Sequence, residues 1–514
     1  MRTIVCCVLL ALTATTVYAE LQNMQVGGEL RIRARYWDNV YSNGINGPAQ
    51  LRIPAGFLPA RPTGGPVVSR YDWDDRGNDL KFVEHRTRLN VRADYTNDVS
   101  AFIELESYDL WGEDFRSNYV TGADARAATG NDVEVYQAYI ESREMWGYPL
   151  RLRIGRQEMK MGKGWLVDDI TTALIGQSHD AVRLTYDTNA FSVDAWWSKL
   201  AENSPLEEDG DVDFYGIYAT YKALEPVDIS LYWMYLRDAR SLNDTNFVWP
   251  IEWVEDLLGL DDYDPTNLHT VGLRAFGQYE AWDYDLEVAY QTGDADQVGF
   301  RFKPFGYGDD DAEYDSWAGD LEVGYTFDMQ WSPRVFIGGA YFEGEDNRDL
   351  SFWDWLNPFD RSDASVSFNR LFPGKPYSAI LEIGQDMSNF YQIRGGVEAH
   401  PTETVTAGLT VAYYGINEPF DWPPYVTLGR FRIPIAPALS FWTKEADNEI
   451  GFVTHLYAKY NYSEDLYFKL GWEHLFTGDG LAEGSFTHRY GLEFSGGTDD
   501  ENANYFYCET GLKF

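Results

Sequence analysis

Strict alternation of apolar and polar residues is the feature that most constrains how this chain can fold. In the segment ELRIRARYW (29–37), an apolar residue separates each of Arg31, Arg33 and Arg35 from the next. Successive side chains of an extended strand point to opposite faces, so the arginines share one face and the apolar residues share the other. One face of this strand needs water, and the other needs an apolar environment.

Similar segments recur along the chain, each roughly the 9 to 11 residues that a tilted strand needs to cross a bilayer. We predict strands at 26–38, 81–95, 100–108, 133–142, 149–157, 180–187, 190–199, 213–222, 226–238, 268–279, 282–292, 318–328, 333–343, 388–399, 404–414, 449–461, 466–476 and 503–514. Bacterial single-chain barrels have an even number of strands, so we place the strand-like piece THRYGLEF (487–494) outside the membrane.

The connections between these segments also follow a pattern. Tight connections such as TNDVS (96–100) and NYSED (461–465) take turns with much longer ones. Outer-membrane barrels have short periplasmic turns and long outer loops. The predicted fold is therefore all-β: a transmembrane antiparallel β-barrel of about 18 strands, with short periplasmic turns and long extracellular loops.

The N-terminus predicts export. Residues 1–19 have a basic start, an apolar run and the small-residue exit VYA, which together are typical of a secretory signal peptide. Cys6 and Cys7 fall inside this segment, so residues 20–514, which we expect to form a single barrel domain, keep only Cys508 and no internal disulfide. No later run of 18 apolar residues suggests a spanning helix.

Composition agrees with a barrel wall. Aromatic residues make up 16% of the chain while mean hydropathy is only −0.40, as expected when alternation hides the apolar half of each strand. The net charge of −41 argues against a nucleic-acid partner. Much of the acid lies in clusters such as EEDGDVD (207–213) and GDDDAEYD (308–315), which we interpret as solvated loops.

In a barrel the apolar face meets lipid and the polar face lines the lumen. The arginines predicted to point inward are Arg31, Arg33, Arg35, Arg86, Arg88, Arg92, Arg151, Arg153 and Arg183, with Arg274 and Arg394 further round. Guanidinium groups bind carboxylates in bidentate fashion, so such a face favours anionic solutes. The alternative is that the arginines stiffen the wall by pairing with inward acids, predicted at Glu84, Asp94, Glu104, Glu106, Glu141, Asp194, Glu287, Glu322, Glu398 and Glu473.

The sequence resembles the alginate-export family of outer-membrane porins. The resemblance rests on the arginine-alternating first strands, on RLRIGRQEMKMGKGW (151–165), on DAVRLTYD (180–187) and on EHLFTGDG (473–480). It implies a monomeric 18-stranded barrel in a Gram-negative outer membrane, whose basic lumen passes an anionic uronate polymer outward without ATP or catalysis. It places the basic constriction at Arg31, Arg33, Arg86, Arg88, Arg92, Arg151, Arg153, Arg156 and Arg183.

Three further features bear on function. The chain ends in Phe514 on an alternating strand, which resembles the assembly signal of outer-membrane proteins. The connection after Arg156 contains Gly162, Lys163 and Gly164, and either folds into the barrel mouth or stays on the surface. Acidic runs at Asp294, Asp296 and 309–315 are weak candidates for loop Ca²⁺, because they lack a full calcium-loop pattern, and we predict no other cofactor.

Catalysis is not predicted. Ser178, His179 and Asp180 are adjacent, and adjacent residues of an extended segment point to opposite faces, so they do not form a catalytic triad. We therefore expect a passive channel for anionic solutes, in particular an acidic polysaccharide or its fragments, embedded in lipid and served by periplasmic export components. The alternatives are a general diffusion porin for small organic ions or sugars, and an outer-membrane enzyme or structural barrel.

Overall fold

The computed structural model describes residues 20–39, 79–96, 98–111, 133–169, 174–202, 211–239, 265–295, 313–344, 367–374, 376–382, 386–419, 447–482 and 501–514, together with a few short strands between them. The predicted signal peptide, Asp296 and residues 309–312 lie outside these ranges. No helix among the described residues is long and apolar enough to cross a membrane.

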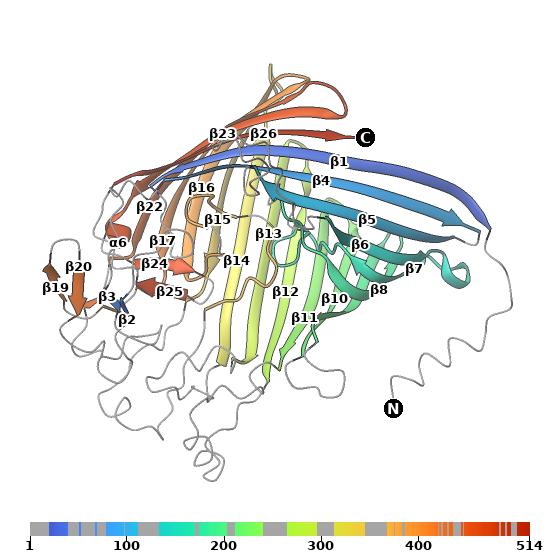
Figure 1. Ribbon diagram of the computed structural model, residues 1–514, viewed down its shortest axis with the longest axis horizontal. Helices are drawn as coiled ribbons and strands as arrows, with labels where there is room; N and C mark the ends of the chain where they lie inside the picture. The colour runs from blue at the N-terminus through green and yellow to red at the C-terminus, as the bar shows by residue number, and fades with distance from the viewer. Residues whose placement is uncertain are drawn as a thin grey trace, which may run out of the picture.

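Eighteen strands form one antiparallel sheet that closes on itself (Figure 1). They are β1 (Leu21–Asp38), β4 (Leu80–Tyr95), β5 (Val99–Leu110), β6 (Val133–Ser142), β7 (Leu150–Gln157), β8 (His179–Asp187), β9 (Phe191–Ala201), β10 (Val212–Leu224), β11 (Val227–Asp238), β12 (Thr266–Tyr279), β13 (Trp282–Asp294), β14 (Glu313–Thr326), β15 (Arg334–Phe342), β16 (Phe390–Thr402), β17 (Val405–Ile416), β22 (Glu449–Asn461), β23 (Leu466–Thr477) and β26 (Ala503–Lys513). The predicted architecture and strand number are confirmed.

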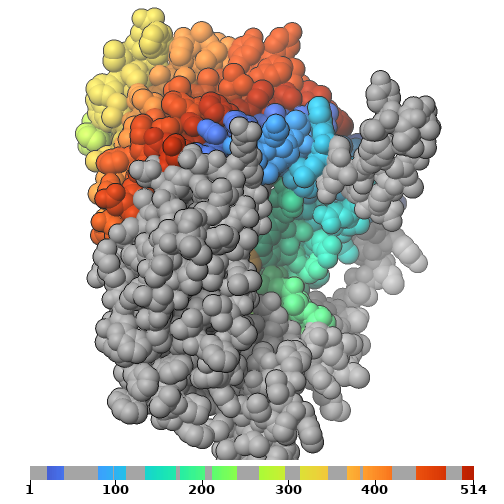
Figure 2. Space-filling view, turned by 60° about the vertical axis from the view of Figure 1, so that its left-hand side comes forward, coloured from blue at the N-terminus to red at the C-terminus, as the bar shows by residue number. Residues whose placement is uncertain are grey.

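Each barrel strand pairs with its neighbour in the sequence, and β1 also pairs with β26 to close the ring. In the space-filling view the first strands lie directly beside the last (Figure 2). The remaining elements are short: β2 (Leu51–Arg52), β3 (Val67–Val68), β18 (Asp421–Trp422), β19 (Tyr425–Leu428), β20 (Phe431–Pro434), β21 (Lys444–Glu445), β24 (Ser485–His488), β25 (Gly491–Phe494), η2 (Met145–Gly147) and α6 (Asp479–Ala482). β24 and β25 pair only with each other, so the described residues of the piece 487–494 lie outside the barrel sheet, as predicted.

Alternation along each strand separates the two faces as predicted. Outward apolar side chains stay exposed, for example Leu231 at 59% and Ile337 at 65%, whereas inward polar side chains such as Arg86 are buried. An exposed apolar band is stable in hydrocarbon and would not be in water. The apolar core is unusual for a barrel, because buried residues such as Val167 and Phe368 lie on connections inside it.

All the short turns lie at one end of the barrel, together with Leu21 and Phe514, and the long connections lie at the other. The first is therefore the periplasmic end and the second the extracellular end. Both acidic clusters were expected to be solvated loops, and both predictions were wrong in part. Val212 and Asp213 begin β10 after the buried Asp211, and Glu313, Tyr314 and Asp315 begin β14. Tyr314 is buried inside, and the two acids alternate with it on the outward face, so the segment follows the same parity as the other strands.

Candidate conduction pathway

The strands place nine of the predicted arginines on the inner face of one wall. Arg31, Arg33 and Arg35 come from β1, and the others follow on β4, β7 and β8. The inward set is Arg31, Arg33, Arg35, Arg86, Arg88, Arg92, Arg151, Arg153 and Arg183, all buried or half-buried. These positions alternate with outward residues such as Leu30 and Leu89, which is why one strand pattern fixes the placement of the whole group.

Arg156 is the exception, and its predicted place in the lumen is wrong. In β7 the inward residues are Arg151, Arg153 and Gln157, so strict parity turns Arg156 outward. There it forms a two-pronged ion pair with Asp180 of β8, with both nitrogen–oxygen distances 2.9 Å. The neighbouring His179 points inward and is buried. His179 and Asp180 thus lie on opposite faces, as expected for adjacent strand residues.

Toward the middle of the wall, each arginine has a carboxylate partner. Arg33 Nε lies 2.7 Å from Glu84, and Arg86 Nη2 lies 2.6 Å from Glu29. The remaining pairs of this group are Arg31 with Glu509, Arg35 with Glu84, and Arg88 with both Glu106 and Glu158. These charges are largely neutralised within the wall, which supports a structural role for this part of the arginine face.

Aromatic rings hold several of these guanidinium groups flat. Arg88 lies 3.8 Å from the centre of the Tyr136 ring, and Arg35 lies 4.2 Å from that of Trp37. Arg153 stacks in the same way on Tyr139 at 4.2 Å. A planar, weakly hydrated guanidinium suits this contact, whereas an ammonium suits it less well. The stacking fixes the direction in which each arginine presents its donors.

Near the periplasmic end of β4–β9, arginines outnumber the carboxylates that pair with them. We call this group the rim cluster: Arg92, Arg143, Arg151, Arg153 and Arg183 with Asp94, Glu141, Asp194 and Thr185. Its five guanidinium groups meet three carboxylates, which leaves two positive charges in excess. Among the ion pairs of the described residues none includes Arg151, whose Nη2 donates to the Thr185 hydroxyl at 3.2 Å.

The connection between β7 and β8 folds into the barrel, which was one of its two predicted positions. Met159, Leu166 and Val167 are fully or almost fully buried. The described parts of a second segment, 367–374, 376–382 and 386–389, also lie inside the barrel. The two are joined by backbone hydrogen bonds from Asp168 N to Phe372 O at 3.0 Å and from Phe372 N to Leu166 O at 2.9 Å. We refer to residues 158–169 and 174–178, with 367–374, 376–382 and 386–389, as the inner loops.

Charged and polar anchors fasten the inner loops to opposite walls. Lys163 Nζ lies 2.8 Å from Asp320 on β14 and 3.4 Å from Asp285 on β13. On the other side, Glu473 of β23 accepts the Ser378 hydroxyl and the backbone N–H groups of Ala379 and Ile380, the latter two at 3.2 Å. The inner loops therefore bridge the barrel interior between β13–β14 and β23.

Further contacts complete this bridge. Trp37 Nε1 on β1 donates to the Ala379 carbonyl at 3.0 Å, and Arg86 on β4 donates to the Leu174 carbonyl at 2.9 Å. Tyr377 joins the two loops to the wall, because its hydroxyl receives a hydrogen bond from Trp165 and donates one to Asp320. Any solute that crosses the barrel must pass this assembly or displace it.

The carboxyl of Asp169 is the titratable group of the inner loops that stands out. Burial, together with the neighbouring Asp168 and Glu158 carboxylates, raises the pKa of Asp169 to about 6. Lys160 pairs with Asp168 at 2.9 Å and does not remove the effect. Within the ranges that the structure describes, no three His, Cys, Asp or Glu side chains gather as a metal site.

Comparison with known proteins matches this chain to one protein family. The family model described as Alginate export matches residues 72–484. Similar solved structures include Pseudomonas aeruginosa OccK8 (OprE), with 10% identity, a TM-score of 0.48 and coverage of 96% of this chain and 98% of that chain. Another is Pseudomonas aeruginosa OccD3 (OpdP), with 11% identity, a TM-score of 0.48 and coverage of 98% and 96%. No curated protein matches the sequence significantly. The fold assignment rests on the strand pairing itself.

Proposed function

This chain belongs to the alginate export family, and on that premise we propose that it passively conducts an acidic polysaccharide of the alginate kind, or its fragments. As a member of that family it is an outer-membrane channel of a Gram-negative bacterium. The proposal concerns what passes through it and which residues the solute meets. It also holds that the barrel acts as a monomer, and that periplasmic export components deliver the polymer to it.

The rim cluster carries this proposal. A uronate polymer presents one carboxylate on each sugar, and a guanidinium donates two parallel hydrogen bonds to a carboxylate. Arg151 faces the lumen beside Arg153 and Arg183 and has a neutral hydroxyl as its hydrogen-bond partner. An anion at the periplasmic end can therefore bind the Arg151 guanidinium without first breaking an ion pair between that group and a carboxylate.

The two roles considered for the arginines thus fall on different residues. Arg31, Arg33, Arg35, Arg86 and Arg88 have carboxylate partners close by and hold neighbouring strands in register. The solute-binding role falls to the excess charge of the rim cluster, with Arg151 as its centre. On the wall of a channel, two positive charges in excess raise the local concentration of anions.

A general diffusion porin is the competing function, and the acidic wall favours it. Asp283, Asp285, Glu287, Asp320 and Glu322 cluster on β13 and β14, where Lys163, Arg274, Arg334 and Arg394 neutralise them in part. If these carboxylates determine the electrostatic potential in the lumen, small cations and neutral sugars pass through the barrel as readily as anions do.

Planar-bilayer recording of the full reconstituted chain separates the two functions. We expect a reversal potential in a KCl gradient that indicates anion preference, and block of the current by oligouronates. Arg151→Gln should weaken the block about tenfold, the equivalent of about 1.4 kcal/mol. Arg156→Gln is the matched control, because it removes one arginine from the same strand but from the lipid-facing side.

Either of two results would count against an acidic polysaccharide. Cation preference without oligouronate block would identify a general porin whose arginines serve the wall. Equal weakening by Arg151→Gln and by the Arg156→Gln control would mean that block depends on overall charge and not on the rim cluster.

A further inference from the structure

A trough crosses the outward face of the barrel where the two ends of the chain meet. It has a volume of about 620 Å³. Its floor is a row of outward residues that pair in register across five neighbouring strands, namely Ala407, Ala458, Leu470, Cys508 and Ala34. Four of the five are small, so the surface of the barrel sinks along this row. We call this feature the seam trough.

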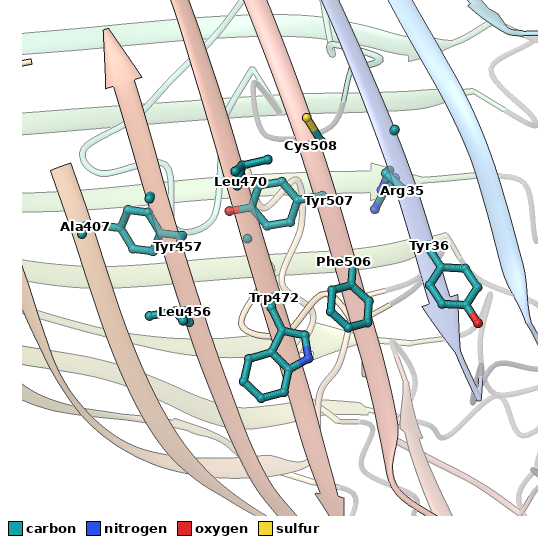
Figure 3. A pocket seen from close by; sticks show the side chains of 13 residues that line it. Arg35, Tyr36, Ala407, Leu456, Tyr457, Leu470, Trp472, Phe506, Tyr507 and Cys508 are labelled. Atoms are coloured by element: carbon teal, nitrogen blue, oxygen red, sulfur yellow. The ribbon is translucent and has the colours of Figure 1, made fainter. Parts of the chain in front are cut away.

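Large side chains form the extracellular bank of the seam trough. Figure 3 shows Leu456, Trp472, Phe506 and Tyr36 side by side on four neighbouring strands. They belong to the next outward row toward the extracellular end. On the periplasmic side the next row contains Tyr460, Phe468, Thr510 and Ile32. The trough is thus one row of residues wide, with large side chains lining its extracellular side.

The direction of the seam trough follows from strand tilt. Ala407 is two residues beyond the start of β17 at a periplasmic turn, whereas Ala34 is four residues before the extracellular end of β1. The row therefore climbs obliquely through the membrane. Its length is about four strand spacings, or roughly 19 Å. A narrow, straight, apolar trough of this length fits one extended hydrocarbon chain.

The side chain of Lys81 supplies a positive charge at the extracellular end of the seam trough. Tyr36 pairs in register with Lys81 on β4, and both side chains point outward. Lys81 is exposed, and β4 begins one residue before it, at the level where lipid head groups are expected. Two acids lie beside this row: Asp79 accepts a hydrogen bond from the Tyr36 hydroxyl at 3.2 Å, and Asp38 lies two residues beyond Tyr36 on the same outward face of β1.

We propose that the seam trough binds a straight, saturated acyl chain of an outer-leaflet lipid, whose phosphate meets Lys81. The chain lies over Ala34, Cys508 and Ala458, against Trp472 and Phe506. Lipid is the medium that surrounds this face, so no apolar partner has to be brought from elsewhere. The proposal does not depend on which solute the barrel conducts.

Cys508 reports occupancy directly, because it lies in the floor and is exposed. The full chain in mild detergent is treated with a maleimide, and alkylation of the peptide that contains Cys508 is followed by mass spectrometry. Added dipalmitoyl phosphatidate, which has a phosphate head and saturated chains, should slow the reaction at least about fivefold. Native mass spectrometry of the same samples should show the lipid retained.

Two variants test the two parts of the site. Ala458→Phe fills the floor and should abolish lipid retention, whereas Ala195→Phe, a matched substitution on an outward alanine of β9, should leave it unchanged. Lys81→Gln should reduce protection of Cys508 by dipalmitoyl phosphatidate, but not protection by a dipalmitoyl lipid that lacks phosphate.

The inference is overturned if dipalmitoyl phosphatidate leaves the alkylation of Cys508 unchanged. It is also overturned if both alanine variants lose lipid equally. Protection that rises with protein concentration in the absence of lipid would mean that a second copy of the chain covers the trough, which would contradict a lipid site.

Discussion

Lys163 Nζ lies 2.8 Å from an oxygen of Asp320, and this contact ties an inner loop to the far wall of the barrel. Asp285 and Glu287 lie within 4 Å of the same ammonium group. Arg274 also pairs with Asp285, and Arg394 with Asp320, so three cations face these three carboxylates. Without Lys163, one negative charge remains in excess. Lys163 therefore keeps this part of the wall neutral and the loop in place at the same time.

Replacement of this lysine should loosen the inner loops. Lys163→Met removes one of the three cations around these carboxylates and leaves one negative charge in excess, at a cost of about 1–3 kcal/mol in loop docking. We expect faster hydrogen exchange at 160–168 and a larger, noisier single-channel current. Lys222→Met, which breaks an exposed ion pair with Asp187 at the periplasmic end, is the control. Equal changes in both variants would show that Lys163 does not fasten the loop.

Glu473 should be equally important for the second inner loop. The residue is 4% exposed, and its carboxylate receives hydrogen bonds from Ser378, Ala379 and Ile380. Glu473→Gln keeps the shape but turns one acceptor into a donor that faces N–H groups, which costs about 1–3 kcal/mol. Hydrogen exchange at 377–382 should rise while the thermal unfolding of the barrel strands changes little. Unchanged exchange there would show that other contacts hold the loop.

The docking of the first inner loop should weaken as pH rises. The folded-state pKa of Asp169 is about 6, above the ordinary value for aspartate, so the docked loop binds this proton more tightly than a released loop does. Docking is then strongest below about pH 4 and loses free energy as pH rises through about 6. Hydrogen exchange at 164–169, corrected for its intrinsic pH dependence, should be several-fold faster at pH 8 than at pH 5. Asp169→Asn should remove the difference, and its persistence in that variant would assign the effect to another group.

Phe514 should matter for assembly more than for the finished barrel. Its backbone exchanges two hydrogen bonds with Gly28, at 2.9 and 3.0 Å, while the residue as a whole is 66% exposed. Phe514→Ala keeps the backbone bonds and loses little buried surface. We expect less barrel in the outer membrane, but an unchanged melting temperature for the fraction that folds. A large drop in melting temperature would mean that the ring holds the folded seam.

The fold could be predicted from the sequence because alternation is a local signal with a fixed consequence. Arg31, Arg33 and Arg35 must share a face in any strand, and the surrounding apolar residues indicate which face meets lipid. The same rule places Arg156 outward. Its inclusion among the lumen arginines came from the family resemblance, and the parity of Arg151 and Arg153 on the same strand already contradicted it.

The inner loops were harder to foresee, because tertiary contacts hold them. The glycines around Lys163 indicated a loop that could turn inward, but nothing local indicated Asp320 as its partner. The second loop was missed altogether. One available signal was its apolar run at 379–381, since Ile380 and Leu381 lie in a long extracellular connection that alternation does not explain. Apolar residues without a strand pattern in such a connection suggest burial inside the barrel.

The pairing of β1 with β26 also determines the order in which the molecule can be completed. Arg31 and Glu509, which meet across this seam, are separated by 478 residues. Until the last strand is available, the other strands can only form an open sheet with two unpaired edges, a form prone to wrong pairings. One edge of β1, the first barrel strand in the sequence, therefore stays unpaired until β26 is available. The pairing of β1 with β26 is the step that closes the barrel.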